Sequence, residues 1–421
     1  MTLQSPTVFD EEACHRSRED FPSLSRTCCG HPVAFLDGPG GTQVPQPVID
    51  AIVDCYHHRN VNTHGSFQPS AELDTRMLQA RSAVADLLGA RGHEQISIGQ
   101  NMTTLAFSLS RAIGRTIRPG DEILITQLDH EANRGPWQSL QERGAVVREV
   151  PLLPTGELDY AQMRKLINEK TRLLALGCSS NAIGTVNNLA LARELTRNAG
   201  ALLILDAVHY VPHFPVDVRQ LDPDFLLCSA YKFYGPHIGI LYSRPGALDT
   251  LPTDRLIVQD DTAPYRIETG TLNHPAIEGV GAAVDYLARF GRGATRADQV
   301  HDAIAAISLY EHKLGEFLWS ALEELRGVRL WGVKFSDRLR APTVSFIIDD
   351  VDPGFIAKSL DAVGICVWDG NFYAPRPVEI LNIPGRALLR VGISMYNTQE
   401  EVERLVACVA ALARSKRGIG R

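Results

Sequence analysis

Residues 201–236 contain the two segments that decide the fold, ALLILDAVH at 201–209 and FLLCSAYKFYGP at 225–236. Each segment opens with an unbroken apolar run, which is typical of a strand buried on both faces of a parallel sheet. Each run then ends in polar residues, Asp206 after the first and Lys232 after the second. The chain here predicts two buried parallel strands whose carboxyl ends carry functional groups.

The same pattern continues outward from this stretch between about residues 44 and 245. Short apolar runs alternate with segments of helical periodicity, such as Leu73 to Leu88 before Gly89, and this alternation indicates an α/β domain. The predicted strands are Ile96–Ile98, Glu122–Thr126, Val146–Val150, Arg172–Leu176, Ala201–Leu205, Phe225–Cys228 and Ile238–Tyr242.

A different organisation begins near residue 275. Helical periodicity predicts helices near 277–287 and 297–325, alternating strands follow around Val344–Ile348 and Leu389–Ile393, and Thr398 with Glu401 forms a capping-box pattern before the last helix. The expected division is an N-terminal segment at 1–30 that packs on the small domain, a large α/β domain at 31–280, and a small α+β domain at 281–421.

Composition excludes several classes of protein. The 421 residues carry a net charge of −7 without a basic stripe, so nucleic acid is not expected as a partner. No apolar run reaches the roughly 18 residues of a membrane span, and the first 20 residues are acidic where a secretory signal is basic and then apolar. We therefore expect a cytoplasmic protein. The eight cysteines contain no C-x-x-C pair, so neither a disulfide framework nor a metal site is expected.

Polar residues follow four of the predicted strands. GQNMTT at 99–104 opens a helix and offers backbone donors with the Thr103 and Thr104 hydroxyls for a phosphate. LDHEAN at 128–133 offers His130, a flat titratable ring. Asp206 and Lys232 follow the two strands quoted first, and burial would lower the pKa of the lysine toward a nucleophilic amine.

Each of these groups has an ordinary structural explanation when taken alone: a capped helix, a loop histidine, a salt-bridged carboxylate or a solvated lysine. Together they supply phosphate donors, a stacking ring, a carboxylate for a ring nitrogen and a Schiff-base lysine. Those are the parts that hold pyridoxal 5'-phosphate, and they occur on successive strand ends.

Longer motifs then connect the chain to a known family. From about Phe35 to Leu412 it resembles the class V aminotransferases of fold type I, in the branch of the cysteine desulfurases and selenocysteine lyases. The motifs that carry the resemblance are LDGPGGT at 36–42, DHEANRGPW at 129–137, SNAIGT at 180–185, DAVH at 206–209, SAYK at 229–232 with YGP at 234–236, and RVGISMYNT at 390–398. The resemblance implies a mostly parallel seven-stranded sheet in the large domain, a smaller C-terminal domain and pyridoxal phosphate as the cofactor.

The resemblance also implies roles for individual residues. Lys232 would form the internal aldimine and move the α-proton, Asp206 would hold the pyridine nitrogen protonated, and His130 would stack on the ring. Asn181 and His209 would lie beside the phenolic oxygen, and Asn181 would also lie near the substrate carboxylate. Phosphate contacts would come from Met102, Thr103, Ser229 and Tyr231, and from Thr271 of the neighbouring subunit, which implies a homodimer.

Substrate groups are expected in the C-terminal part. Arg390 lies in an alternating strand opposite its apolar face, where a bidentate clamp on an α-carboxylate is the best use of a guanidinium, with a surface salt bridge as the alternative. In the stretch GICVWDGNFYAP at 364–375, Tyr373 replaces the mobile-loop cysteine of desulfurases and Trp368 stands where they commonly have arginine. Cys366 is expected to be buried in the preceding strand. A persulfide route is therefore in doubt, and a larger, less polar substrate pocket is the hypothesis.

The reaction stays open at this level. Loss of the α-proton and of a β-substituent would give carbon–sulfur lyase or desulfurase-like chemistry on a cysteine-type amino acid, with Tyr373 or His130 as a proton donor. The alternatives are transamination with a keto acid acceptor and a non-catalytic scaffold for sulfur transfer. A dinucleotide site at Gly38, Gly40 and Gly41 fails on glycine spacing and on the prolines that follow, so this segment is predicted to be a turn at the rim of the active site.

Overall fold

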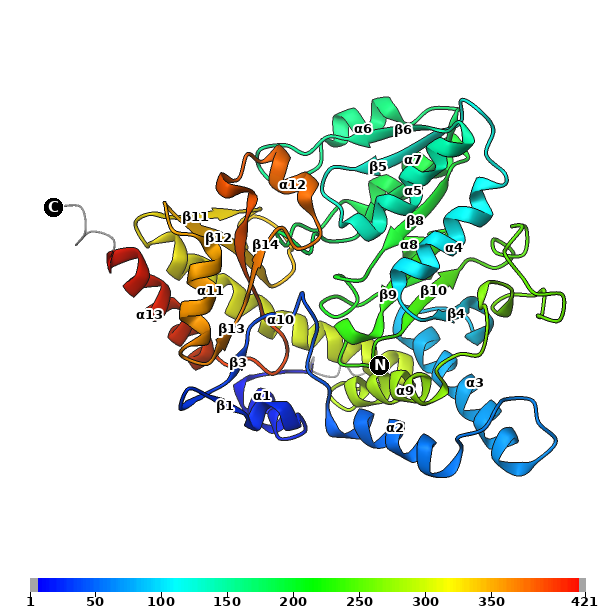
Figure 1. The fold of residues 1–421 in the computed structure, drawn as a ribbon, viewed down its shortest axis with the longest axis horizontal. Helices are drawn as coiled ribbons and strands as arrows, with labels where there is room; N and C mark the ends of the chain where they lie inside the picture. Colours follow the sequence, from blue (N-terminus) through cyan, green and yellow to red (C-terminus); the bar gives the residue numbers. More distant parts are fainter. Residues whose placement is uncertain (1–6, 416–421) are drawn as a thin grey trace, which may run out of the picture.

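The computed structural model describes residues 7–415. A seven-stranded sheet forms the core of the larger part of the molecule and a four-stranded sheet that of the smaller part, to the right and left in Figure 1. In order across it, the larger sheet consists of β4 (Ile96–Gly99), β10 (Gly239–Ser243), β9 (Phe225–Ser229), β8 (Leu202–Asp206), β7 (Thr171–Gly177), β5 (Glu122–Thr126) and β6 (Val146–Val150). The seven predicted strands are confirmed, with ends that differ by a residue or two.

The direction and order of the strands determine where their carboxyl ends lie, and with them the functional groups that the sequence predicts there. All neighbouring pairs are parallel except β10, which is antiparallel to both β4 and β9. The chain passes from β5 to β6 on one side and returns to β7 on the other, so the strand order reverses between β5 and β7. Ligands of open α/β sheets bind beyond the carboxyl ends of the strands at such a reversal.

Helices cover both faces of this sheet. Neighbouring residues of β5 point into opposite cores, Leu124 into one and Ile123 with Ile125 into the other. On the face of Leu124 lie α2 (Gln46–His58), α3 (Gln68–Leu88), α6 (Tyr160–Leu166), α7 (Leu189–Ala199) and α9 (His274–Ala288). On the other lie α4 (Met102–Gly114) and α5 (Gly135–Gln138). The sheet is therefore covered on both faces, although the edge strand β6 is half-exposed.

Local sequence explains where the key helices begin and end. The side chain of Asn101 accepts a hydrogen bond from the backbone N–H of Thr104 at 2.9 Å and so caps α4. Gly239 of β10 lies against this turn, and a Cβ there would come within 2.2 Å of the Asn101 carbonyl carbon. Glycine at 239 thus lets the N-terminus of α4 approach the sheet. Helix α3 ends at Gly89, which has a left-handed φ of 67°.

The smaller part has an antiparallel sheet of its own. Its strands, in order, are β11 (Val328–Trp331), β12 (Thr343–Ile348), β15 (Leu388–Gly392) and β14 (Trp368–Gly370). The helices around it are α10 (Arg296–Glu323), α11 (Pro353–Asp361), α12 (Pro375–Ile380) and α13 (Gln399–Ser415). The capping box of the last helix is present, with Thr398 and Glu401 bonding each other's backbone N–H at 3.3 Å.

The N-terminal residues pack on this C-terminal part. Two short two-stranded sheets pair β1 (Thr27–Cys28) with β2 (His31–Pro32), and β3 (Ala34–Phe35) with β13 (Ile365–Cys366). The thiol of Cys14, on α1 (Glu11–Arg18), donates to the carbonyl of Asn397 at 3.3 Å, and Arg18 pairs with Glu401 at 2.9 Å. The helix α10 crosses between the two parts in Figure 1 and packs on both α9 and β12.

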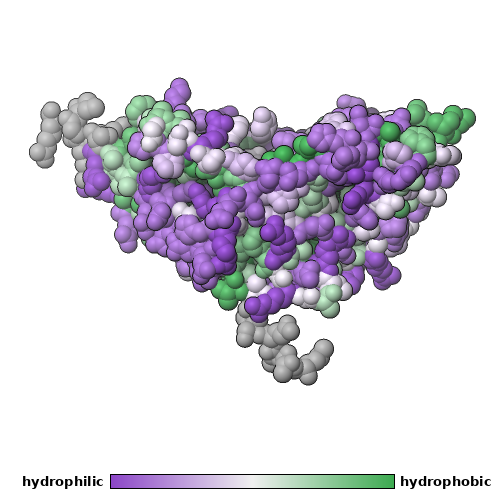
Figure 2. Space-filling view, turned by 90° about the horizontal axis from the view of Figure 1, so that it is seen from below, coloured by the Kyte–Doolittle hydropathy of each residue, from purple (hydrophilic) through white to green (hydrophobic). Residues whose placement is uncertain are grey.

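The surface fits the composition. The face drawn in Figure 2 is largely hydrophilic, and its apolar residues form separate small areas. No helix within residues 7–415 is long and apolar enough to cross a membrane.

Candidate active site

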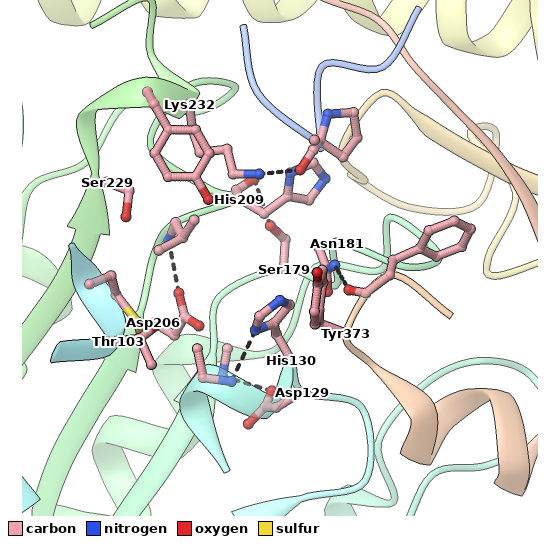
Figure 3. Close-up of a pocket in the computed structure, with 18 of the residues that line it drawn as sticks. Thr103, Asp129, His130, Ser179, Asn181, Asp206, His209, Ser229, Lys232 and Tyr373 are labelled. Atoms are coloured by element: carbon pink, nitrogen blue, oxygen red, sulfur yellow. Dashed lines mark hydrogen bonds between the residues drawn. The ribbon is translucent and has the colours of Figure 1, made fainter. Parts of the chain in front are cut away.

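A cavity of about 250 Å³ lies beyond the carboxyl ends of the large sheet, where β15 and β14 of the small sheet close it. Every site residue predicted from the sequence except Thr104 and Thr271 lines this cavity, although these residues come from both halves of the chain (Figure 3). They are Met102, Thr103, His130, Asn181, Asp206, His209, Ser229, Tyr231, Lys232, Trp368, Tyr373 and Arg390.

Lys232 follows β9 in a short 3-10 turn and is only 8% exposed. Its ammonium group donates to the carbonyl oxygen of Pro39 and lies 4.7 Å from the ring centre of Tyr231. Burial lowers the pKa of Lys232 to about 7, and the positive charge of Arg390 acts in the same direction. A large share of this amine is therefore neutral and nucleophilic near pH 7.

Asp206 is the last residue of β8 and is also buried. Its carboxylate accepts from the backbone N–H of Val208 at 2.9 Å and has no salt-bridge partner among the described residues. Burial raises the pKa of Asp206 to about 6, which the positive charge of Lys232 partly offsets. A buried carboxylate without a cation would gain from a protonated ring nitrogen beside it.

His130 follows β5 and faces the cavity next to Tyr373, whose ring centre is 5.8 Å from that of His130 (Figure 3). Its Nδ1 accepts the backbone N–H of Ala132 at 3.0 Å, which assigns the ring proton to Nε2. Burial lowers the pKa of His130 to about 4, so the ring is neutral at physiological pH.

The N-terminus of α4 forms another wall of the cavity with Met102 and Thr103. Ser229 and Tyr231 face this turn, so the four predicted phosphate contacts of this chain lie together. Free backbone N–H groups at a helix N-terminus suit an anion. The prediction for Thr104 is wrong: its hydroxyl donates to the carbonyl of Asn101 at 2.9 Å, and it lines a different cavity. The cause is that Thr104 points away as the helix turns.

Asn181 follows β7, and its Nδ2 donates to the carbonyl of Phe372 at 2.9 Å. Its Oδ1 is buried without a hydrogen-bond partner in the described structure. His209 contacts the hydroxyl of Thr343 through Nε2 at 2.9 Å, and burial keeps its pKa well below the ordinary value. Asn181 and His209 thus follow strands of the large sheet, and both form hydrogen bonds with residues of the C-terminal part.

Arg390 enters the cavity from β15 and is 3% exposed. Its Nη1 donates to the carbonyl of Asn181 at 3.1 Å, its guanidinium carbon lies 4.3 Å from the ring centre of Phe372, and its Nε is buried without a partner. No carboxylate of the described residues lies in salt-bridge contact with it, although the charge of Asp37 acts on it from a greater distance. Burial lowers its pKa to about 10, so it remains a cation with free donors.

Trp368 lies in β14, directly opposite Arg390 across the strands. Its indole Nε1 donates to Asp37 at 2.8 Å, and half of the side chain is exposed. Cys366 is half-buried in β13 rather than fully buried as predicted, because this short strand pairs on one side only. No cysteine of residues 7–415 lines the cavity.

Thr271 lies outside the cavity of its own chain. It is exposed and lines two shallower hollows with Glu268 and Leu272. The loop at 38–41 does reach the rim, since Pro39 and Gly40 line the cavity.

Several groups that line the cavity were given no role in the sequence analysis, among them Asp129, Phe372 and the carbonyl of Pro39. Asp129 precedes His130, accepts the backbone N–H of Gly177 at 2.9 Å, and has a pKa raised to about 7 by burial. Its position at a strand exit could have revealed it, as it did Asp206. Phe372 and the carbonyl of Pro39 carry no such signal, because their placement depends on packing between the two parts.

The chain matches the family model of the class-V aminotransferases over residues 34–405. It is 35% identical over 408 residues to a cysteine desulfurase of Serratia proteamaculans (93% of this chain, 96% of the relative), and 35% identical over 405 residues to one of Shigella flexneri (92% and 95%).

The comparison with solved structures gives the same result as the comparison of sequences. The cysteine desulfurase CsdA of Escherichia coli superposes with a TM-score of 0.83 at 27% identity, covering 96% of this chain and 98% of its own. The cysteine desulfurase of Thermococcus onnurineus superposes with a TM-score of 0.86 at 26% identity, covering 95% of this chain and 98% of its own. The predicted resemblance and α/β fold type I are confirmed, and the chain belongs to the class-V aminotransferase family of enzymes.

Proposed function

We propose that the protein is a pyridoxal phosphate-dependent enzyme that cleaves the carbon–sulfur bond of a cysteine-type amino acid. The observation that carries the proposal is Lys232, a buried amine with a pKa of about 7 in one cavity with a buried acid and a free buried guanidinium. The relatives named cysteine desulfurase support the substrate class.

The residues present fit this cofactor. Asp206 forms no salt bridge among the described residues, Asn181 has a buried Oδ1 without a hydrogen-bond partner there, and the N-terminus of α4 faces the cavity with Met102 and Thr103. In the proposed arrangement Met102, Thr103, Ser229 and Tyr231 hold the phosphate, with Thr271 of a second subunit. Asp206 holds the ring nitrogen, His130 covers the ring, and Asn181 and His209 lie beside the phenolic oxygen.

When bound, pyridoxal phosphate supplies an electron sink that weakens the bonds at the α-carbon of an amino acid. Arg390 binds the α-carboxylate, because its Nε and remaining Nη donors lack partners among the described residues. Lys232 removes the α-proton through its neutral amine. Nε2–H of His130 and the hydroxyl of Tyr373 are the two groups that can protonate the departing sulfur.

The sulfur leaves this cavity in solution rather than on a thiol of the chain. Tyr373 occupies the position of the desulfurase cysteine, and none of the cysteines lines the cavity in the described residues. Burial also raises the pKa of Cys366, so its thiol is a poor nucleophile. This feature favours a lyase over a persulfide-forming desulfurase.

We further propose a homodimer in the cytoplasm. The exposed position of Thr271, away from its own cavity, supports a role in the site of a second subunit. The eight cysteines are all unpaired, as is usual in a reducing compartment.

The test begins with the colour of the purified protein. The wild type should show a visible absorption band after incubation with pyridoxal phosphate, and borohydride should attach the cofactor covalently to it. Lys232→Ala should show neither the band nor the covalent attachment. L-Cysteine should then yield sulfide, pyruvate and ammonia without any keto acid. A colourless wild type would refute the cofactor. A strict need for a keto acid acceptor would make the enzyme an aminotransferase, and bound cofactor without turnover of any amino acid would favour a scaffold.

A further inference from the structure

Three aromatic side chains line the cavity from one short segment, which consists of β14 and the loop that joins it to α12. We refer to Trp368, Phe372 and Tyr373 together as the aromatic wall. Phe372 is buried, whereas Trp368 is 48% and Tyr373 71% exposed, so the latter two flank the open side of the cavity. Large aromatic rings left in water at the mouth of a cavity are a feature of binding sites for apolar groups.

The aromatic wall is held in place from several directions. The indole of Trp368 is fixed by its 2.8 Å hydrogen bond to Asp37, a half-buried carboxylate 331 positions earlier in the chain. The carbonyl of Phe372 accepts from Asn181 at 2.9 Å, and the carbonyl of Tyr373 accepts from the backbone N–H of Glu131 at 2.8 Å. The segment is thus tied to the ends of β3, β5 and β7, and its rings form a preorganised surface rather than a swinging loop.

The aromatic wall adjoins the groups that would hold an amino acid. Phe372 lies against the guanidinium of Arg390 at 4.3 Å, and Trp368 is the cross-strand partner of Arg390. Tyr373 lies beside His130 (Figure 3). A substrate whose carboxylate is bound by Arg390 therefore has aromatic surface next to its side chain. A thiol group is too small to cover it.

We propose that the substrate is an S-substituted cysteine, a thioether whose sulfur carries an aromatic group that packs on the aromatic wall. This inference rests on the proposed function and deepens it. A thioether sulfur needs no attacking thiol, which agrees with a tyrosine at position 373 and with the lack of a cysteine among the described lining residues.

The reaction balances without an oxidant or a reductant. The α-proton passes to the amine of Lys232, the bond between Cβ and sulfur breaks, and its electron pair leaves on sulfur, which takes up a proton to give the free thiol. Water then completes the conversion of the three-carbon remainder to pyruvate and ammonium. Overall, one thioether amino acid and one water give one thiol, one pyruvate and one ammonium ion.

The experiment compares S-benzyl-L-cysteine, S-methyl-L-cysteine and L-cysteine as substrates of the holoenzyme, with pyruvate and free thiol as readouts. We expect kcat/KM for the benzyl compound to exceed that for the methyl compound by a factor of about ten to a hundred, the range over which apolar pockets discriminate. Trp368→Ala and Tyr373→Ala should each reduce this ratio about tenfold. Phe355→Ala removes an exposed phenyl ring that does not line the cavity and should leave the ratio unchanged.

A binding measurement separates failure of this inference from failure of the proposed function. Calorimetry on the holoenzyme with 2-amino-5-phenylpentanoate, which has the benzyl group but no sulfur, should show at least tenfold tighter binding than with L-alanine. Carbon–sulfur cleavage in which L-cysteine is the best substrate, together with equal binding of these two probes, would overturn the aromatic substrate and leave the lyase standing. Tight binding of the aromatic probe without cleavage of any cysteine compound would overturn the lyase and leave the aromatic wall as the site's specificity element.

Discussion

At the scale of single residues, burial is the main determinant of the chemistry in this cavity. Removal from water moves the pKa of Lys232 down to about 7 and that of Asp206 up to about 6. The two shifts favour the neutral form of each group, as expected where low polarity penalises charge. A lysine that is neutral near pH 7 can react with an aldehyde, which a solvated lysine does poorly.

The rate at which the apoenzyme takes up pyridoxal phosphate should therefore depend on pH. Below the pKa of about 7 for Lys232 the ammonium form dominates, so the rate should rise about tenfold per pH unit as the pH increases. Above pH 7 the amine is neutral and the rate should level off. Stopped-flow absorbance between pH 5.5 and 9 measures it. A rise that continues beyond pH 9 would show an ordinary, solvated lysine.

Arg390→Ala should weaken amino acid binding by about 2–5 kcal/mol, the cost of truncating one partner of a buried charge pair. The measurement is the dissociation constant of L-alanine in wild type and variant. Ethylamine, which lacks the carboxylate, serves as the control and should bind the two proteins equally. Unchanged affinity for L-alanine would remove Arg390 from the substrate site.

At the scale of elements, one buried arginine joins the loop after β7 to the small sheet. Arg340 is 1% exposed, donates to the carbonyl of Ile183 at 2.9 Å and bonds the carbonyl of Thr343. Its guanidinium carbon also lies 4.7 Å from the ring centre of Trp319. Since Thr343 contacts His209, Arg340 supports two walls of the cavity without lining it.

Arg340→Met should reduce the free energy of unfolding by about 3 kcal/mol, because it leaves buried carbonyls without donors. Urea unfolding followed by circular dichroism measures this change. Arg329→Met is the matched control, since Arg329 is half-exposed and pairs with Asp349 at 2.7 Å, and such surface pairs contribute less than about 1 kcal/mol. Equal losses in the two variants would show that Arg340 has no special structural role.

At the scale of the whole molecule, the cavity exists only between two sheets that fold from different parts of the chain. The large sheet supplies Lys232, Asp206 and His130, and the small sheet supplies Arg390. A ligand that contacts both parts binds the folded state alone and stabilises it by mass action.

Pyridoxal phosphate at a hundred times its dissociation constant should therefore stabilise the protein by about 2.7 kcal/mol, seen as a higher Tm in scanning calorimetry. Asp206→Asn retains the shape of the side chain but not its charge and should show a smaller increase. Light scattering on the same samples should give twice the chain mass of 46.2 kDa. A monomer with full activity would contradict the proposed role of Thr271.

The sequence alone predicted the seven strands and the groups at their ends. Unbroken apolar runs identify strands buried on both faces, and parallel strands bring their carboxyl ends to one edge. His130, Asp206 and Lys232 could therefore be placed together without coordinates. The family resemblance added roles for Asn181 and His209, and strand alternation added one for Arg390. The structure places these three side chains in the same cavity.

Only the tertiary structure decided how the two sheets meet. The hydrogen bonds of Asn181 with Phe372 and of His209 with Thr343 join the large sheet to the C-terminal part. The bond between Asp37 and Trp368 joins segments 331 positions apart. The carbonyl of Pro39 that faces Lys232 has no side-chain signature at all. Such contacts follow from packing between elements, and hydrophobic periodicity specifies which face of an element is buried but not which partner covers it.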